Sequence, residues 1–423
     1  MRQFLRVLLL VLFLVFALSS CKLVDIDKPN NSPASKEPIV IMIGIDGLAW
    51  DAIDRHPAPT LQAMARDGVR AKSLIPTMPT KTFVNFYSLA TGLYADGTGI
   101  TDNTPYSKKY EEIMARDMHG QTRWWGGEPI WVTAEKQGVR TAAMFWLGSE
   151  AKIKGKRPTH WTAYDHYKPH KERVDQVLDW LAMPTQDQPR FLTLYYSDVD
   201  SASHRYGPKT PEEGNAILKI DKSIAELRIG IEDLGLTDRV NLIVVSDHGM
   251  IKIDPEFMIY LDDYIDLEEV FIPAFHSSAG PHSDPFVHIY VKDAGNIDQV
   301  YNNLKNAHKG LQVYKRAEIP ANWHLNHPDR TGDIFVVADG GGMIFARKLK
   351  SKYKYAAKGM HGYDRFHKDM GASFIATGPN FKKGVSAAPF DNVEVYGIIA
   401  KILKLDPAQT DGDIKNVEYF LNP

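Results

Sequence analysis

The stretch that decides the fold is residues 39–47, which read IVIMIGIDG. Its first seven residues are apolar or small, without polar alternation, which is typical of a strand covered on both faces of a parallel sheet. We therefore expect a buried strand over Ile39–Ile45, followed at once by Asp46. Three further runs have the same character and are expected to be parallel strands of the same sheet: Thr141–Trp146, Phe191–Ser197 and Val240–Ser246.

Segments with helical periodicity lie between these strands. The longest is Pro211–Leu234, and shorter helices are expected over Thr60–Asp67 and Val174–Ala182. The apolar residues of the long segment recur every three or four positions, at Ile217, Ile220, Ile224, Leu227 and Ile231. Strands that alternate with helices predict an α/β fold with a doubly wound central sheet flanked by helices.

The pattern changes after residue 253. Phe286–Val291 and Asp333–Ala338 are expected to be strands, and Ile297–Lys305 is expected to be a helix. We predict a smaller inserted α+β subdomain over residues 254–340 and assign residues 38–253 and 341–423 to the main domain.

The N-terminus resembles a secretory signal over residues 1–20. Arg2 and Arg6 give a positively charged start, and Leu5–Leu18 is almost wholly apolar but short for a membrane span of ~20 residues. Two serines then lead to Cys21, the single cysteine of the chain, as in the lipobox of bacterial lipoproteins. We expect a lipidated Cys21, a tether over residues 21–37 and an exported protein anchored by lipid to a bacterial membrane. If the cell is Gram-negative, Lys22 after the cysteine indicates the outer membrane, with the protein facing the periplasm. An uncleaved membrane anchor is the alternative.

Composition excludes several classes of protein. The chain has 50 Lys and Arg against 52 Asp and Glu, so its formal net charge is -2. This balance gives no basic footprint for nucleic acid. One cysteine excludes an internal disulfide framework and a cysteine-based zinc module. The 15 histidines therefore direct attention to sites made of nitrogen and oxygen ligands.

Carboxylates follow three of the predicted strands. Asp46 ends the first strand, Asp198 and Asp200 follow the third, and Asp247 and His248 follow the fourth. Parallel strands bring their carboxyl ends to one edge of the sheet, where binding sites gather. A helix cap explains one such aspartate, but several together repel one another unless a cation lies between them. The sequence therefore predicts a metal site at this edge.

Two histidines and a threonine extend this candidate site. His204 follows Asp200 by four residues, so both can face one ion from a turn or a short helix, and His361 lies in a segment flanked by glycines. Oxygen and nitrogen ligands without sulfur suit zinc in a catalytic role. Residues 79–92 are expected to be a loop that leads into a helix. Thr80 or Thr82 at its start is either a nucleophile or a helix N-cap, and the pattern leaves both open.

Together these residues resemble the nucleotide pyrophosphatase/phosphodiesterase family, a branch of the alkaline phosphatase superfamily. The resemblance covers most of residues 39–384 and rests on an ordered set of short motifs. They are Asp46-Gly47, Lys81-Thr82-Phe83, Gly92-Leu93-Tyr94, Gly99-Ile100-Thr101-Asp102-Asn103, Gly127-Glu128-Pro129-Ile130-Trp131, Asp200 with His204, Asp247-His248-Gly249-Met250 and His361-Gly362-Tyr363-Asp364.

The resemblance implies an alkaline-phosphatase-like fold and two zinc ions. Carried over by position, the ligands of one zinc ion are Asp46, Thr82, Asp247 and His248. Those of the other are Asp200, His204 and His361. Thr82 resembles the nucleophile that forms a phospho-threonine intermediate, and Asn103 resembles the side chain that steadies the phosphoryl oxygens.

The resemblance also implies a substrate pocket. Phe83 and Tyr164 resemble an aromatic pair that holds a nucleobase, and Tyr195 is expected to line the same pocket. The chain departs from the family's common motifs at Val84, Phe86, Ser203, Met360 and Arg365. None of these departures removes a ligand or the nucleophile, so they bear on the shape of the pocket.

The expected activity is hydrolysis of nucleotide phosphodiesters or phosphoanhydrides to nucleoside 5'-monophosphates. One alternative keeps the two-zinc mechanism and acts on choline-containing or glycerophospholipid diesters. A phosphomonoesterase or another hydrolase of the superfamily is a further alternative, and a non-catalytic zinc- or ligand-binding lipoprotein is the last. The expected partners are the small-molecule substrate and the membrane that holds the lipid anchor; no specific nucleic-acid or protein partner is expected.

Overall fold

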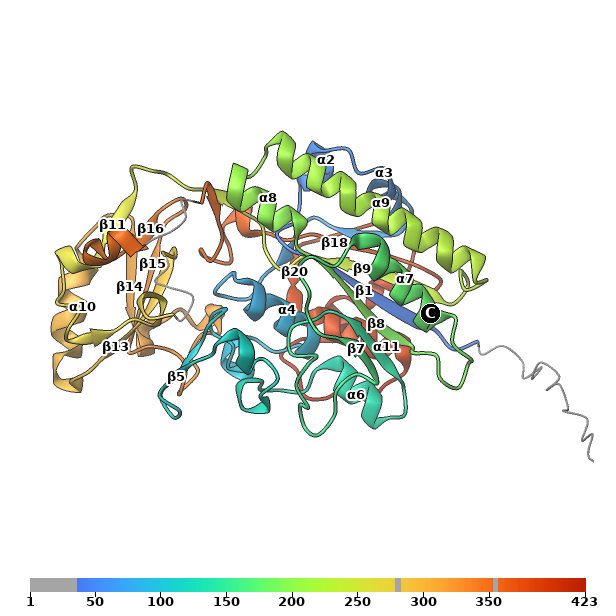
Figure 1. The fold of residues 1–423 in the computed structure, drawn as a ribbon, viewed down its shortest axis with the longest axis horizontal. Helices are drawn as coiled ribbons and strands as arrows, with labels where there is room; N and C mark the ends of the chain where they lie inside the picture. Colours follow the sequence, from blue (N-terminus) through green and yellow to red (C-terminus); the bar gives the residue numbers. More distant parts are fainter. Residues whose placement is uncertain (1–35, 278–282, 353–356) are drawn as a thin grey trace, which may run out of the picture. The chain divides into compact units, whose positions relative to one another are not determined.

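An eight-stranded sheet lies at the centre of the computed structural model, which describes residues 36–277, 283–352 and 357–423 (Figure 1). The strand order is β19-β2-β18-β9-β1-β8-β6-β7. Their bounds, in that order, are Val385–Ala387, Val69–Ala71, Phe374–Thr377, Val240–Val245, Ile39–Ile45, Phe191–Tyr196, Thr141–Met144 and His160–Thr162. The four strands expected from the sequence are β1, β6, β8 and β9, and they run parallel to one another. The α/β fold with a large central sheet is confirmed.

The sheet is mixed rather than wholly parallel, which the sequence did not predict. β18 runs antiparallel to both of its neighbours, β9 and β2. β2, β18 and β19 have only three or four residues each, too few to give a recognisable hydrophobic pattern. β1 lies between β8 and β9 and is buried along its whole length, as the opening stretch predicted.

Helices cover both faces of the sheet (Figure 1). One face carries α3 (Pro59–Asp67), α7 (His170–Leu181), α8 (Asp198–Tyr206) and α9 (Pro211–Asp233). The other carries α4 (Thr82–Thr91), α6 (Ile130–Lys136) and α11 (Val395–Leu403). The long predicted helix is α9, which ends one residue before the predicted end. Its N-cap, Thr210, accepts a hydrogen bond from the N–H of Glu213, and its predicted apolar stripe is buried.

A second sheet of four antiparallel strands has a hydrophobic core of its own. The strands are β12 (Val270–Phe271), β13 (Phe286–Val291), β15 (Ile334–Ala338) and β14 (Leu311–Lys315), in that order across the sheet. Helix α10 (Ile297–Lys305) packs against β14. The buried cluster includes Ile289, Leu304 and Val336, and it extends to Ile344 and Ala346. The boundaries of the predicted subdomain, 254–340, stay a prediction.

Shorter elements connect these layers. They are α2 (Ala52–Arg55), α5 (Ala95–Thr98), β3 (Leu74–Ile75), β4 (Tyr106–Ser107), β5 (Glu112–Ile113), β10 (Ile251–Lys252), β11 (Met258–Tyr260), β16 (Met343–Phe345), β17 (Gly359–Met360) and β20 (Phe390–Asp391). The strand pair β10 and β17 matters most for the site, because the residue that follows β17 is His361.

The expected signal, the lipidated Cys21 and the tether up to residue 35 lie outside the described residues. Export and lipid anchoring therefore stay predictions, which incorporation of a labelled fatty acid at Cys21 would test. Within the described ranges, no helix combines the length and the apolar character that crossing a bilayer requires.

Candidate active site

The predicted metal ligands gather at the carboxyl ends of the central strands. Asp46 directly follows β1, and Asp247 and His248 follow β9. Asp200 lies in the first turn of α8, the helix that begins just after β8, and its backbone N–H donates to the Asp46 carbonyl. His361 approaches from the β17 segment. The site thus lies where an α/β sheet most often binds ligands.

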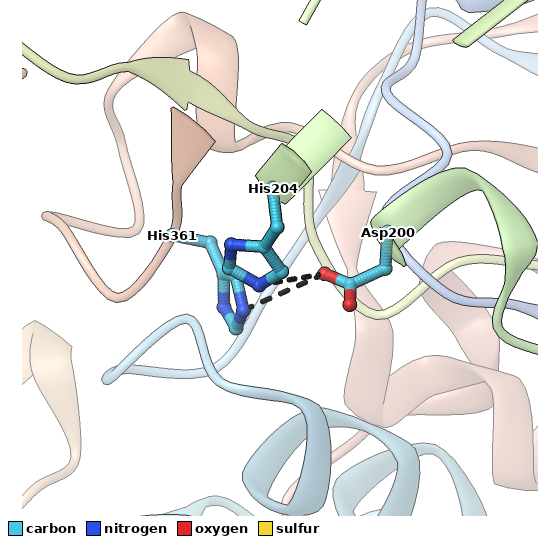
Figure 2. A group of neighbouring side chains, drawn as sticks. All are labelled: Asp200, His204 and His361. Carbon is cyan, nitrogen blue, oxygen red and sulfur yellow. Dashed lines mark ion pairs between the residues drawn. The ribbon is translucent and has the colours of Figure 1, made fainter. Parts of the chain in front are cut away.

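Asp200, His204 and His361 form the first cluster (Figure 2). Asp200 and His204 face the same way because they lie one turn apart on α8. One carboxylate oxygen of Asp200, Oδ1, lies 3.2 Å from His204 Nε2 and 3.6 Å from His361 Nε2. The three ligand atoms of this cluster lie within 4.8 Å of one another.

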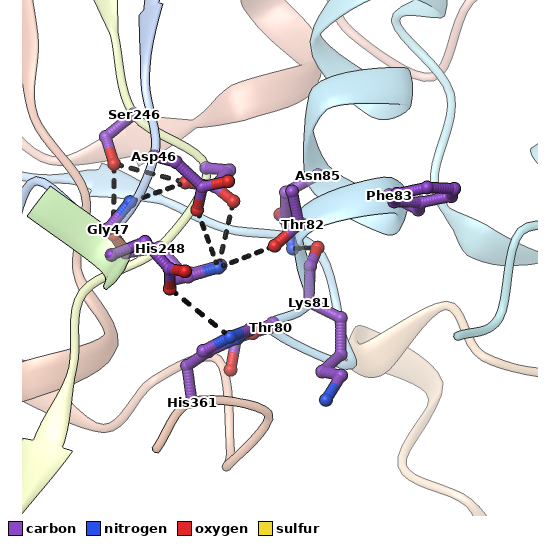
Figure 3. Close-up of polar contacts among 12 residues, drawn as sticks. Asp46, Gly47, Thr80, Lys81, Thr82, Phe83, Asn85, Ser246, His248 and His361 are labelled. Carbon is purple, nitrogen blue, oxygen red and sulfur yellow. Dashed lines mark hydrogen bonds and ion pairs between the residues drawn. The ribbon is translucent and has the colours of Figure 1, made fainter. Parts of the chain in front are cut away.

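A second cluster adjoins the first and shares Asp200 with it. Ligand atoms of Asp46, Asp200 and His248 also lie within 4.8 Å of one another. His248 Nε2 lies 2.9 Å from Asp247 Oδ2 and 3.5 Å from Asp46 Oδ1. The hydroxyl of Thr82 reaches the same nitrogen at 3.3 Å (Figure 3). The structure therefore brings together all seven residues that the resemblance named as ligands.

Backbone carbonyls orient all three histidine rings. Nδ1 lies 2.8 Å from the Gly359 carbonyl in His204, 2.9 Å from the Gly249 carbonyl in His248 and 2.8 Å from the Thr80 carbonyl in His361. A carbonyl oxygen accepts only, so each Nδ1 carries a hydrogen, and each Nε2 faces the centre, where the neutral ring can offer its lone pair to a metal ion. This tautomer is the one that a metal ligand needs.

The carboxylates fit a divalent cation. Oδ1 of Asp46, Oδ1 of Asp200 and Oδ2 of Asp247 are buried oxygens without a hydrogen-bond partner among the described residues. Burial and then the neighbouring carboxylates of Asp247 and Asp200 raise the pKa of Asp46 well above its usual value. Burial opposes the charge of Asp200 too, but His204, His248 and Lys81 together outweigh burial and lower the pKa of Asp200. A bound cation would satisfy these oxygens and offset their repulsion.

The structure separates the two candidate threonines. The Thr80 hydroxyl donates to the Tyr363 carbonyl and accepts from the N–H of Gly362, so its bonds hold the segment that carries His361. Thr82 is the first residue of α4, and the N-cap position belongs to Lys81, whose side chain makes no cap bond. Thr82 is therefore a first-turn residue, not an N-cap, and its hydroxyl faces the metal-ligand cluster.

Asn103 lies beside the start of the same helix. Its Oδ1 accepts a hydrogen bond of 2.8 Å from the backbone N–H of Phe83. This bond fixes the orientation of the amide, and no described residue accepts from its Nδ2, which is left as a donor for a ligand.

The three aromatic residues of the expected pocket have different surroundings. The Phe83 ring points away from the Asp46–His248 cluster and contacts His119 edge to face, with ring centroids 4.9 Å apart (Figure 3). Tyr164 is 40% exposed and contacts Tyr195 edge to face, at 5.9 Å. Tyr195 is almost buried, and its hydroxyl donates to Asp46 Oδ2 at 2.5 Å.

Sequence reasoning missed two sets of contacts around this site, although Lys81 and Gly47 lie in motifs that it identified. The buried Lys81 Nζ pairs with Asp284 Oδ1 at 2.6 Å. The Ser246 hydroxyl and the Gly47 N–H both approach Asp247 Oδ1, at 3.3 and 3.0 Å. No local sequence pattern predicts these contacts, because each contact depends on the folded arrangement of the loops.

The Lys81–Asp284 pair gives a stability prediction. Burial opposes the charge on Lys81, but Asp284, with Asp102 and Asp200, outweighs burial and raises the pKa of Lys81 overall. Asp284→Ala leaves that ammonium without its partner and is expected to lower the free energy of unfolding by about 3–5 kcal/mol. Denaturant titration measures the change. Asp175→Ala, which breaks the exposed Lys171–Asp175 pair, is the control and is expected to have little effect. An Asp284→Ala variant as stable as the control would contradict the prediction.

Comparison with known proteins identifies relatives over most of the chain. The family model described as type I phosphodiesterase/nucleotide pyrophosphatase matches residues 40–364. A pyrophosphatase/phosphodiesterase of Schizosaccharomyces pombe is 33% identical over 396 residues, 90% of this chain and 79% of that protein. The bis(5'-adenosyl)-triphosphatase of Xenopus laevis is 32% identical, over 96% of this chain and 87% of that protein. The chain spans about half the length of the venom phosphodiesterases that it also matches, such as that of Naja atra, 46% of which is covered.

A solved structure shows the same likeness. Murine ectonucleotide pyrophosphatase/phosphodiesterase 5, in an inactive variant with a threonine replaced by alanine and in complex with AMP, superposes with a TM-score of 0.84. The two are 30% identical, and the match covers 91% of this chain and all of the other.

Proposed function

The chain belongs to the type I phosphodiesterase/nucleotide pyrophosphatase family, whose members hydrolyse phosphoric diesters, and from this premise we propose that it cleaves nucleotide diesters or phosphoanhydrides to nucleoside 5'-monophosphates. The observation that carries the proposal is the placement of the Thr82 hydroxyl at the start of α4, 3.3 Å from His248 Nε2 within the metal-ligand clusters. The triphosphatase activity named for the frog relative and the AMP bound by the murine relative support a nucleotide substrate.

Two zinc ions are the proposed cofactors. One set of ligands is Asp46, Thr82, Asp247 and His248, and the other is Asp200, His204 and His361. When bound, the ions would supply Lewis acidity that lowers the pKa of a hydroxyl or a water and stabilises negative charge on oxygen. The buried carboxylate oxygens that accept no hydrogen bond from the described residues and the inward-facing Nε2 atoms support this assignment.

Thr82 acts as the nucleophile in the proposed reaction. Its hydroxyl gives up its proton to solvent, Oγ1 attacks phosphorus in line, and a new Oγ1–P bond forms. The bond from phosphorus to the leaving oxygen breaks with the electron pair going to that oxygen, which can take up a proton from solvent. Hydrolysis of the phospho-threonine by water then releases the nucleoside monophosphate and restores the hydroxyl. Because Thr82 is fixed in the first turn of a helix, its hydroxyl needs little reorganisation before attack.

Asn103 and the start of α4 stabilise the charge on the transferred group. The Asn103 amide is held by its bond to the Phe83 N–H, so its Nδ2 is oriented before substrate arrives. The first turn of α4 adds the positive end of the helix dipole on the same side. Both act most strongly in the transition state, where the oxygens carry the most charge.

Phe83 is proposed to stack on the nucleobase, with Tyr164 on the other side. Phe83→Ala is expected to raise KM for the p-nitrophenyl ester of a nucleoside monophosphate about 10-fold, because stacking on an aromatic side chain contributes about 1–3 kcal/mol per base. KM for bis(p-nitrophenyl) phosphate, which carries no base, is expected to change little. Steady-state kinetics with both substrates measure the difference.

The matched control for Phe83→Ala is Tyr419→Ala, which removes a ring that is 45% exposed and contacts Phe420, not a site residue. It is expected to leave both KM values unchanged. If Phe83→Ala raised KM equally for the two substrates, base stacking on Phe83 would be wrong, although the diesterase chemistry would stand.

A further inference from the structure

Tyr195 lies next to the strand end that carries Asp46. It is on β8, which pairs in parallel with β1, and its register partner is Gly44, two residues before Asp46. Its hydroxyl donates to Asp46 Oδ2 at 2.5 Å, across 149 residues of sequence, and both side chains are buried. A phenol hydroxyl that donates to an ionised carboxylate makes a short, charge-assisted hydrogen bond.

This hydrogen bond makes the two carboxylate oxygens of Asp46 differ in their surroundings. Oδ2 is taken by Tyr195, whereas Oδ1 has no hydrogen bond from the described residues and lies 3.5 Å from His248 Nε2. Asp247 shows the same division, since Oδ1 is held by Gly47 and Ser246 and Oδ2 faces His248 Nε2. In both residues one oxygen is tied to the protein and the other is left for a ligand.

The Tyr195 ring is fixed by packing. Phe86 contacts it edge to face at 5.3 Å and Tyr164 does so at 5.9 Å. Gly44 allows this arrangement, because a Cβ at that position would lie 2.7 Å from the Phe86 ring. The hydroxyl therefore meets Asp46 in one orientation, set by the core and not by the substrate.

We propose that Tyr195 is a positioning residue for the metal centre: its hydroxyl orients Asp46. Lining the nucleobase pocket is not its main role. The inference rests on the metal centre of the proposed function but not on its substrate. Partners that orient a metal ligand typically change metal affinity by about 10–100-fold when they are removed. A pocket wall would instead change KM and leave metal affinity as it was.

The test compares Tyr195→Phe with Tyr164→Phe in the chain without its predicted signal. Both variants lose one hydroxyl and keep the ring. The Tyr164 hydroxyl lies 3.1 Å from His166 Nδ1 and contacts no metal ligand, so Tyr164→Phe is the matched control. Zinc affinity is measured by competition with a chromophoric chelator, and kcat and KM are measured at saturating zinc.

Tyr195→Phe is expected to weaken the affinity for zinc about 10–100-fold and to leave KM for a nucleotide ester within about 2-fold. Tyr164→Phe is expected to leave zinc affinity unchanged. In an Asp46→Ala background, Tyr195→Phe should have no further effect on zinc affinity, because the hydroxyl then has no carboxylate to orient. This double-mutant cycle separates positioning from a general loss of stability.

Unchanged zinc affinity in Tyr195→Phe, or a rise in KM alone, would overturn the proposal, as would a wild-type protein that binds no zinc. If the wild type binds zinc but hydrolyses no nucleotide ester, the proposed function fails while the affinity comparison still decides the role of Tyr195.

Discussion

Thr82→Ala is expected to lower kcat by about 10⁴-fold or more while the protein stays folded. Loss of the nucleophile removes the covalent route, and removal of the nucleophile of a serine protease lowers kcat by a factor of about 10⁶. The substitution removes a hydroxyl that lies 3.3 Å from His248 Nε2, in the site, so we expect the hydrophobic core to stay intact. Steady-state hydrolysis of a nucleotide p-nitrophenyl ester measures kcat, and thermal unfolding checks the fold.

Thr82→Ser provides the matched control. It keeps a hydroxyl at the start of α4 and is expected to retain measurable turnover, whereas the alanine variant does not. The alanine variant should bind close to the wild-type amount of zinc, because the other proposed ligands keep their positions. Four of them are buried, namely Asp46, Asp247, His248 and His361, and the Gly359 carbonyl holds the ring of His204. Near-normal kcat in Thr82→Ala would show that another group is the nucleophile.

Removal of divalent metal is expected to lower activity by a factor of about 10³ or more. Addition of zinc is expected to restore the activity. Metal ions contribute several kcal/mol to stabilisation of transition-state charge, and each ~1.4 kcal/mol is a tenfold change in rate. Dialysis against a chelator, followed by addition of zinc, magnesium or calcium, measures both loss and recovery. Both ligand sets contain histidine nitrogens, which favour zinc over magnesium and calcium, so zinc should restore the most activity.

Metal removal should also change how stability depends on pH. Without a cation, the pKa of buried Asp46 is raised in the folded state, so the folded state binds a proton more tightly than the unfolded state. This contribution favours folding at low pH and is lost as pH rises through the raised pKa. The gain in Tm on adding zinc should therefore be larger at pH 8 than at pH 5. Full activity after exhaustive chelation, or no effect of zinc on Tm, would contradict the metal assignment.

The central strands were predictable because burial on both faces leaves a strong local signal. Ile39–Ile45 and Phe286–Val291 have the predicted bounds, and the apolar stripe of α9 gave its length to within one residue. The antiparallel β18 could not be predicted from its own residues, because Phe374–Thr377 has four residues and its direction is set by pairing with β9. Direction and register are properties of the assembled sheet.

The ligands of the site were predictable for a related reason. Asp46, Asp200 and Asp247 follow strong strand signals, and the topology of an α/β sheet brings such strand ends together. The bond between Tyr195 and Asp46 was not predictable, since it depends on the position of a ring within the core. The sequence therefore identified Tyr195 as a site residue and expected it in the base pocket, whereas its closest polar contact is with Asp46.

The central claim is a two-zinc phosphodiesterase that selects nucleotides, and one substrate comparison tests it most directly. Zinc-loaded protein beginning at residue 22 is assayed with the p-nitrophenyl ester of a nucleoside monophosphate, p-nitrophenyl phosphorylcholine and p-nitrophenyl phosphate. We predict the highest kcat/KM for the nucleotide ester. A higher value for the choline ester would contradict nucleotide selection and keep the threonine mechanism, and a higher value for the monoester would contradict the diesterase assignment itself.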